Sequence, residues 1–210
     1  MYLNSTLSIL QWNCNSLTKR AAEFMKHIEN KNEAYDVICL QETFLKPGKH
    51  FRLLGYNIVR KDREDAKGGL ITFVKEGLNF SEVDVTNKLE NITVKVNIKG
   101  SCLQVINIYI PPGKIVEKNV LEKFTVHSKT VIMGDLNGKS TMWGSESSDE
   151  RGRLLEEFIE SKGAVVINTG QPTYQHYSGT QSHLDVAIVS SDLAARANWT
   201  VINNTQPNAS

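Results

Sequence analysis

The sequence predicts an α/β fold in which two packed β-sheets carry helices on their outer faces. Strand-like segments outnumber helical ones, and the helical segments are interspersed among them. No internal repeat, low-complexity segment or linker divides the 210 residues, so we expect a single domain spanning 1–210. That length suits a two-sheet α/β domain, and the pattern fits a barrel or a doubly wound sheet less well.

Hydrophobic periodicity predicts the elements in chain order. Leu7–Trp12 is a short β-like run, and apolar residues at helical spacing predict a helix over 17–30. The continuous apolar run Val37–Leu40 is typical of a strand buried on both faces. Ile92–Ile98 alternates apolar and polar residues, so one of its faces should be wet. A second helix is expected over Arg153–Ser161, ending at Gly163. The other expected strands are Tyr56–Arg60, Leu70–Val74, Leu103–Ile110, Thr130–Met133, Ala164–Ile167 and Leu184–Val189.

Composition indicates a globular protein of a reducing compartment. Hydrophobic residues make up 40% and charged residues 22% of the chain, and no apolar run is long enough to cross a bilayer. The N-terminus lacks the pattern of a signal peptide. The three cysteines are an odd number without metal-binding spacing, so we expect reduced thiols. A net charge of +1 argues mildly against a nucleic-acid partner.

Isolated polar residues fall where buried-looking strands end. Four strands are expected to end in an acid or an amide, and a fifth ends in a tyrosine followed by two prolines; the residues are Asn13, Glu42, Asp135, Asp185 and Tyr109. Rigid strands that lead into loops are where α/β folds position reactive groups. Each residue alone has an ordinary structural explanation, such as a cap, a turn or a satisfied core hydroxyl. Five together favour a functional site.

As a set, these residue types suit the hydrolysis of a phosphodiester. The carboxylate of Glu42 is a hard ligand suited to Mg²⁺, which takes only one or two protein oxygens. Asp135 is a second carboxylate able to accept a proton from an attacking water, and Asn137 could hold that water without adding charge. The hydroxyl of Tyr109 offers a donor to the developing negative charge. The sequence contains no nucleophile elbow, glycine-rich phosphate loop or zinc spacing, so direct attack by water remains.

The ordered motifs resemble those of the endonuclease/exonuclease/phosphatase superfamily. The matching segments are Gln11-Trp12-Asn13, Leu40-Gln41-Glu42-Thr43, Asn107-Ile108-Tyr109-Ile110-Pro111-Pro112, Gly134-Asp135-Leu136-Asn137 and Ser182-His183-Leu184-Asp185. Smaller features resemble the endonuclease domains of non-LTR retrotransposons: Gly68-Gly69-Leu70, Trp143-Gly144-Ser145, Arg151-Gly152-Arg153, Asn168-Thr169-Gly170 and Pro172-Thr173-Tyr174. The resemblance implies a four-layer α/β sandwich of two packed mixed β-sheets flanked by helices, with the active site at one end.

The resemblance also implies a role for each site residue. Glu42 would be the metal ligand with Asn13 beside it, Asp135 the water-activating carboxylate and Asn137 its positioning partner. Tyr109 would contact the phosphate, and Asp185 would orient a histidine. The family pattern closes with Ser-Asp-His, whereas this chain stops at Ser210. We therefore expect the chain to be truncated just before the terminal Asp-His and to nick DNA weakly or not at all.

None of the five histidines matches the position of the missing one. His183 is near Asp185 in the sequence, but we do not expect the two to pair, on the argument that neighbours along a strand point to opposite faces.

Two segments are candidates for contact with DNA. The stretch Gln175–Gln181 is expected to form a β-hairpin beside the active site, and in retrotransposon endonucleases such a hairpin is implicated in target choice. The candidate DNA-binding residues are Asn168, Thr173, Tyr174, Gln175, His176, Tyr177 and Ser178. A plain surface loop is the alternative explanation. Between Lys46 and Lys67, seven Lys and Arg residues stand against three Asp and Glu residues and could contact phosphates, although a solvated surface explains them as well.

The function implied is a nick in target DNA that leaves a 3′-hydroxyl to prime reverse transcription. The cofactor would be Mg²⁺, with Mn²⁺ as a possible substitute. The partners would be double-stranded target DNA and the reverse transcriptase region of the same polyprotein, within the nucleus and without a membrane. Two alternatives stay open: another phosphodiesterase of the superfamily, acting on abasic sites or small molecules, and a non-catalytic relative that binds DNA or protein.

Overall fold

The computed structural model describes residues 6–30, 34–65, 67–85, 88–98, 100–176 and 178–202. The strands are β1 (Ile9–Asn13), β2 (Val37–Gln41), β3 (Tyr56–Lys61), β4 (Leu70–Lys75), β5 (Asn79–Val83), β6 (Glu90–Ile98), β7 (Ser101–Tyr109), β8 (Thr130–Asp135), β9 (Ala164–Val166), β10 (Tyr174–Gln175), β11 (Gln181–Ser182) and β12 (Asp185–Ser190). The helices are α1 (Leu17–Glu29), α2 (Lys118–Leu121) and α3 (Glu150–Ser161), with 3₁₀ turns η1 (Thr141–Trp143) and η2 (Ser191–Leu193).

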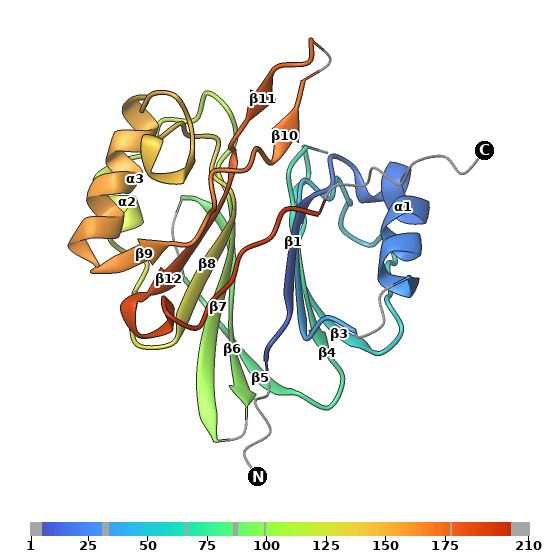
Figure 1. Ribbon diagram of the computed structural model, residues 1–210. Coiled ribbons are helices and arrows are strands. Elements are labelled where there is room, and N and C mark those ends of the chain that lie inside the picture. The colour runs from blue at the N-terminus through green and yellow to red at the C-terminus, as the bar shows by residue number, and fades with distance from the viewer. Residues whose placement is uncertain are drawn as a thin grey trace.

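Two mixed sheets pack face to face with helices on their outer sides (Figure 1). The four-stranded sheet has the order β1-β2-β4-β3, and the six-stranded sheet has the order β5-β6-β7-β8-β12-β9. β1 pairs with β2, and β7 with β8, in parallel; the other pairings within these sheets are antiparallel. β10 and β11 form a hairpin that projects from one end of the molecule (Figure 1). The predicted sandwich of two mixed sheets with flanking helices is confirmed.

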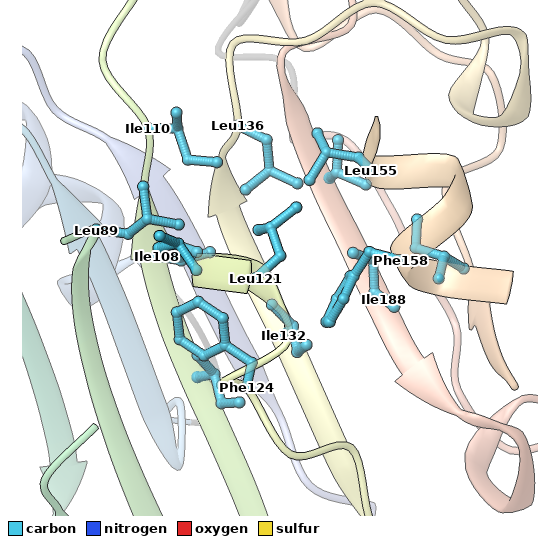
Figure 2. Close-up of a cluster of buried hydrophobic side chains, with 14 of the residues drawn as sticks. Leu89, Ile108, Ile110, Leu121, Phe124, Ile132, Leu136, Leu155, Phe158 and Ile188 are labelled. Carbon is cyan, nitrogen blue, oxygen red and sulfur yellow. The ribbon is translucent and has the colours of Figure 1, made fainter. Parts of the chain in front are cut away.

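Three hydrophobic clusters separate the four layers. One lies between α1 and the four-stranded sheet and includes Phe24 and Leu40. A second lies between the six-stranded sheet and helices α2 and α3, where Ile132 and Ile188 meet Leu121 and Phe158 (Figure 2). The third fills the space between the sheets, with Val37, Cys39, Val94, Met133 and Ala187 among its members. Because neighbouring residues of a strand face opposite sides, alternate residues of each central strand serve different clusters.

This alternation brings the polar residues of the motifs to one place. Along β8, Val131 and Met133 belong to the cluster between the sheets, and Asp135 is the next residue on that face. β7 repeats the arrangement with Val105, Asn107 and Tyr109. On β1, Ile9 packs on the same cluster and is followed on its face by Gln11 and Asn13. The apolar space between the sheets therefore becomes polar towards one end.

The strands expected from periodicity are present, with ends shifted by up to two residues. β5 and the short helix α2 were not expected. The prediction of a wet face on Ile92–Ile98 is wrong for its first half, because Thr93 is buried while Lys95 and Asn97 are exposed. Leu89 and the helices α2 and α3 share a cluster on that side of the sheet, which removes its beginning from water. Among the described residues, no helix is long and apolar enough to span a membrane.

Candidate active site

One row of paired residues crosses the six-stranded sheet at its polar end. Glu90 of β6 pairs with Tyr109 of β7, Tyr109 with Asp135 of β8, and Asp135 with Asp185 of β12. All four lie on the face that looks towards the four-stranded sheet, because each is in phase with the apolar residues of the inter-sheet cluster. Residues separated by up to 95 positions in the sequence, from Glu90 to Asp185, are thus brought into one line.

Asn13 joins the two sheets at this row. Its amide Nδ2 donates to Glu42 Oε1 at 2.8 Å and to Asp135 Oδ2 at 2.7 Å. The nearest oxygens of these two carboxylates therefore lie no further apart than the sum of the two distances. Asn13 Oδ1 accepts from the main-chain N–H of Asn15 at 3.1 Å. The amide nitrogen of Asn13, rather than its oxygen, faces the carboxylates, and its role as a metal ligand stays a prediction.

The carboxyl group of Asp135 lies in a dry and anionic environment. Its side chain is 5% exposed. Burial, followed by the charge of Asp185, raises its pKa from 3.8 to about 7, although hydrogen bonds from Asn13 and from the N–H of Asn137 act in the opposite direction. Burial also raises the pKa of Asp185, against a lowering by its hydrogen bonds from Gln11 and Thr173. A carboxyl group with a pKa near neutrality suits acid–base work.

The hydroxyl of Tyr109 lies beside the same carboxylates. Burial, the negative charge of Glu42 and a hydrogen bond to Glu42 raise its pKa well above the ordinary value, with smaller contributions from Asp135 and Glu90. The phenol is therefore held protonated, as a hydrogen-bond donor. A protonated donor next to carboxylates is the form able to contact a phosphate oxygen.

The two residues that follow the strands adopt left-handed backbone conformations. Glu42 has φ 51° and Asn137 has φ 46°, which costs energy in residues other than glycine. Hydrogen bonds maintain both: the N–H groups of Thr43 and Phe44 donate to the carbonyls of Gly69 and Gly68. The N–H of Asn137 donates to Asp135 Oδ1 at 3.0 Å, and its Nδ2 donates to the Ile110 carbonyl at 3.1 Å. Positive φ values here turn the chain sharply at the edge of the site.

A chain of buried amides lies beneath the carboxylates. Gln11 Nε2 donates to Asp185 Oδ1 and to Gln41 Oε1, both at 2.7 Å, and Gln41 Nε2 donates to Asn107 Oδ1 at 2.6 Å. Asn107 Nδ2 in turn donates to the Ile71 carbonyl at 2.9 Å. The Gln11–Gln41 bond lies within the four-stranded sheet, and the other three cross between the sheets. They fix the position of Asp185 relative to β1 and β2, and the amide oxygen and nitrogen of the buried Gln41 and Asn107 side chains are all hydrogen-bonded.

Sequence reasoning missed several of these residues. Gln11, Gln41 and Asn107 stood inside the quoted motifs but received no role. Glu90 was missed because the expected strand began at Ile92. A signal for these four residues was present in the sequence. Each polar residue lies two positions from an apolar residue of its own strand and therefore on the same face, where an unpaired polar group would be costly. Glu90 Oε2 accepts from the Gly69 N–H at 2.8 Å and Oε1 pairs with Arg63 at 2.7 Å, so it supports the glycine turn beside Glu42.

Asp185 begins its strand rather than ending one, which corrects the expectation. β12 runs antiparallel to β8, so its first residue lies at the same end of the sheet as the last residue of β8. His183 and Asp185 are two residues apart, so in a continuous strand they would share a face, and opposite facing, which was expected to prevent a pair, does not separate them. His183 precedes β12, and its Nε2 is hydrogen-bonded to the Gly170 carbonyl at 3.0 Å.

The predicted DNA-binding residues fall into two groups. Asn168 and Thr173 support the site from within: Asn168 hydrogen-bonds the backbone on both sides of Val186, and Thr173 Oγ1 accepts from the N–H groups of Leu184 and Asp185. The exposed group lies on the β10–β11 hairpin and comprises Tyr174, Gln175, His176 and Ser178. Tyr174 and His176 stack edge to face at 4.7 Å. Tyr177 lies outside the described residues. The expected hairpin is present.

The donors at this end fit a magnesium ion in chemistry. Within the described ranges, no group of three or more His, Cys, Asp or Glu side chains is arranged as a metal site. Mg²⁺ keeps most of its waters and requires only one or two carboxylates, so the convergence of Glu42 and Asp135 on one amide meets its requirement. Glu42 is the residue best placed to hold the ion, since it is only partly buried and open to water on one side.

Two packed mixed sheets with flanking helices are the fold of the endonuclease/exonuclease/phosphatase class. The endonuclease domain of TRAS1, a telomere-specific non-LTR retrotransposon, superimposes with a TM-score of 0.75 at 22% identity, covering 89% of this chain and 86% of that one. A 3′ phosphatase from Neisseria bound to product DNA hairpin gives 0.65 at 17% identity, covering 90% and 89%. These likenesses establish the fold.

The family follows from the sequence. The model described as endonuclease-reverse transcriptase matches residues 103–208, and the chain belongs to that family. A probable RNA-directed DNA polymerase from transposon BS of Drosophila melanogaster is 29% identical over 192 residues, covering 87% of this chain and 21% of that protein. The chain therefore spans about a fifth of the length of this relative. The resemblance to non-LTR retrotransposon endonucleases drawn from the motifs is confirmed, and the family and fold are those of a nuclease.

Proposed function

We propose that this chain is a divalent-metal-dependent endonuclease domain that nicks double-stranded target DNA and leaves a 3′-hydroxyl for reverse transcription. The observation that carries the proposal is the amide of Asn13, which holds Glu42 of one sheet and Asp135 of the other within hydrogen-bonding distance of a single nitrogen. Family membership and the polymerase relatives support the context of retrotransposition. The relative solved with a product DNA hairpin supports a nucleic-acid substrate for the fold.

The roles of the residues follow from their environment. When bound at Glu42, Mg²⁺ would neutralise charge on the phosphate and on its leaving oxygen. Asp135, whose pKa burial and the charge of Asp185 raise to about 7 in the metal-free chain, takes the proton of the attacking water, and Asn137 orients that water from the adjoining turn. Tyr109, held protonated, donates to a phosphate oxygen. Asp185 is the carboxylate that orients the histidine of the family pattern. The domain acts in the nucleus, with the reverse transcriptase region of its polyprotein as partner.

A plasmid-nicking assay tests the proposal. Conversion of supercoiled plasmid to open circles should require Mg²⁺ or Mn²⁺, stop with chelator and leave ends that a DNA polymerase extends. Glu42→Gln and Asp135→Asn should each lower the rate at least ~100-fold, since each removes a group that acts only in the transition state. Glu160→Gln, an exposed carboxylate on α3, is the matched control and should nick as the wild type does.

The same assay separates the alternatives. Because the family pattern closes with Ser-Asp-His, a form that carries Asp-His after Ser210 is assayed beside the 210-residue chain. Abasic duplex and inositol polyphosphate are offered as competing substrates. If both forms cleave abasic duplex or inositol polyphosphate in preference to intact plasmid, the proposed substrate is wrong. Nicking that resists chelator, or full activity of Glu42→Gln, would overturn the metal-dependent mechanism.

A further inference from the structure

Arg151 lies in the first turn of α3, where a cation is not expected. A helix N-terminus carries partial positive charge, so it favours acids such as the capping Asp149. The guanidinium of Arg151 points back from the helix and is half-buried. Burial lowers its pKa, and the negative charges of Asp149 and Asp135 act in the opposite direction. A half-buried cation in an unfavourable position calls for a structural or functional reason.

The hydrogen bonds of Arg151 connect two loops. Its Nη1 donates to the carbonyls of Leu136 at 3.2 Å and Asn137 at 2.7 Å, in the loop that follows β8 and Asp135. Its Nη2 donates to the carbonyls of Pro111 at 3.2 Å and Lys114 at 2.7 Å, in the loop that follows β7 and Tyr109. All four acceptors are main-chain oxygens, so no bonded carboxylate neutralises the guanidinium through these contacts. We call residues 110–114 the β7 loop and 136–140 the β8 loop.

The neighbouring residues press α3 against the β8 loop. A Cβ on Gly152 would lie 1.7 Å from the Lys139 carbonyl oxygen, so only glycine permits this approach. The N–H of Asp149 donates to the same carbonyl at 3.0 Å, and Asp149 Oδ1 caps the helix through the N–H of Gly152 at 2.6 Å. The helix end is thereby fixed on the loop, and Arg151 extends from this fixed base to the β7 loop.

We propose that Arg151 is a positioning residue for nicking: by hydrogen-bonding the β7 and β8 loops at once, it sets where Asn137 and Tyr109 stand relative to each other. The proposal rests on the proposed function. Asn137 adopts a left-handed conformation, and its own carbonyl is the acceptor of one of the two shortest Arg151 bonds. The planar guanidinium directs donors from two separate nitrogens, Nη1 and Nη2, towards the two loops, whereas the single ammonium of lysine does not span both.

The test compares Arg151→Lys and Arg151→Met with Arg153→Met. Arg153 is exposed on the same helix turn and donates to the Ser148 carbonyl at 2.7 Å, which makes it the matched control. In steady-state nicking by the form that carries Asp-His after Ser210, both Arg151 variants should lower kcat by about 10- to 100-fold with KM within about threefold, because a displacement of about 1 Å is sufficient for such a loss. Arg153→Met should keep the wild-type kcat.

Hydrogen–deuterium exchange of the metal-free 210-residue chain supplies a readout independent of activity. Arg151→Met and Arg151→Lys should speed exchange in the β7 loop and in the β8 loop together, by about tenfold, while amides of β7 and β8 keep their protection. A wild-type kcat in both variants, a loss confined to KM, or faster exchange in only one loop would overturn the proposal. If the form that carries Asp-His after Ser210 fails to nick with Mg²⁺, the proposed function fails, and the exchange data still decide whether Arg151 links the loops.

Discussion

The ionisation of Asp135 is the point where the chemistry of a single residue bears on the stability of the fold. Its native pKa of about 7 lies above the ordinary 3.8, so between these values the native state binds more protons than the unfolded chain. Stability contributed by the protonated form is therefore complete below pH 3.8 and is lost as the pH rises through 7. Glu42, Asp185 and Tyr109 are the titratable groups that face it, with Arg151 as the nearby cation.

Asp135→Asn should consequently stabilise the metal-free protein at high pH. The difference in free energy of unfolding between Asp135→Asn and the wild type should be more favourable to the variant by roughly 2–4 kcal/mol at pH 8 than at pH 4, because a pKa shift of this size has that free-energy equivalent. Urea unfolding in chelator at several pH values measures it. Asp192→Asn is the control of opposite sign, since hydrogen bonds, chiefly from Ser190, lower the pKa of that exposed carboxyl group. A pH-independent difference between wild type and Asp135→Asn would contradict the assignment.

Among single residues, the sequence drew attention to Glu42, Asp135, Asp185 and the amide of Asn13, and it missed Glu90 and the amides that lie beneath the carboxylates. An acid at the end of an apolar strand is conspicuous, and the ordered motifs made Glu42, Asp135 and Asp185 stand out. Gln11, Gln41 and Asn107 were not conspicuous, because their importance depends on the facing sheet, and inter-sheet distances follow from packing of the whole core. The contacts of Arg151 depend likewise on two loops whose paths local sequence does not determine.

Among the elements, the β10–β11 hairpin is attached to the site at its base. The N–H of Thr173 donates to the Ser182 carbonyl at 2.9 Å, and Thr173 Oγ1 accepts from the N–H of Asp185. Its tip carries exposed polar side chains, including His176, which is hydrogen-bonded to Ser182 at 2.8 Å. An exposed hairpin beside the carboxylates is suited to contact a duplex on one side of the cleaved bond.

Replacing Gln175–Gln181 by a short Gly/Ser turn should change where DNA is nicked and leave general cleavage intact. The reason is that the hairpin carries none of the carboxylates, while its exposed polar side chains are proposed to contact bases or phosphates. Mapping nick positions on a long duplex by primer extension measures the effect. The matched control replaces the exposed Glu76 by Ser in the turn between β4 and β5, which lies at the opposite end of the strands from Glu42. An unaltered set of nick positions in the hairpin variant would refute its role in target choice.

Element prediction succeeded where hydrophobic periodicity was strong. The buried strands β2, β4 and β8 are continuous apolar runs, and α1 and α3 each show one apolar face. The missed strand β5 has the sequence Asn79-Phe80-Ser81-Glu82-Val83 and lies at a sheet edge with most residues exposed, so its pairing with β6 rather than its composition makes it a strand. The missed helix α2 is only four residues long.

Viewed as a whole molecule, the site is a junction between two sheets. Glu42 follows a strand of one sheet and Asp135 ends a strand of the other, with Asn13 between them. An ion that binds both sides of this junction binds the native state and not the unfolded chain. Mass action then converts metal affinity into stability, by ~2.7 kcal/mol when the ion is present at 100 times its dissociation constant.

Magnesium should therefore raise the midpoint of thermal unfolding by several degrees in a concentration-dependent way. Glu42→Gln should abolish the increase, because it removes the carboxylate best placed for the ion, while Glu160→Gln should retain it. Differential scanning fluorimetry with Mg²⁺, and with Na⁺ at matched ionic strength, makes the measurement. A rise of equal size in Glu42→Gln would mean that the ion acts elsewhere on the molecule.

The row that links Glu90, Tyr109, Asp135 and Asp185 has a consequence for how such a chain tolerates genetic change. Substitutions along these strands alter one contact at a time, whereas the loss of a single codon within β8 would reverse the facing of every residue on one side of the gap. Asp135 would then turn towards α3 and an apolar residue towards the substrate. Length in these strands should consequently be under far tighter constraint than composition, and insertions should be confined to turns.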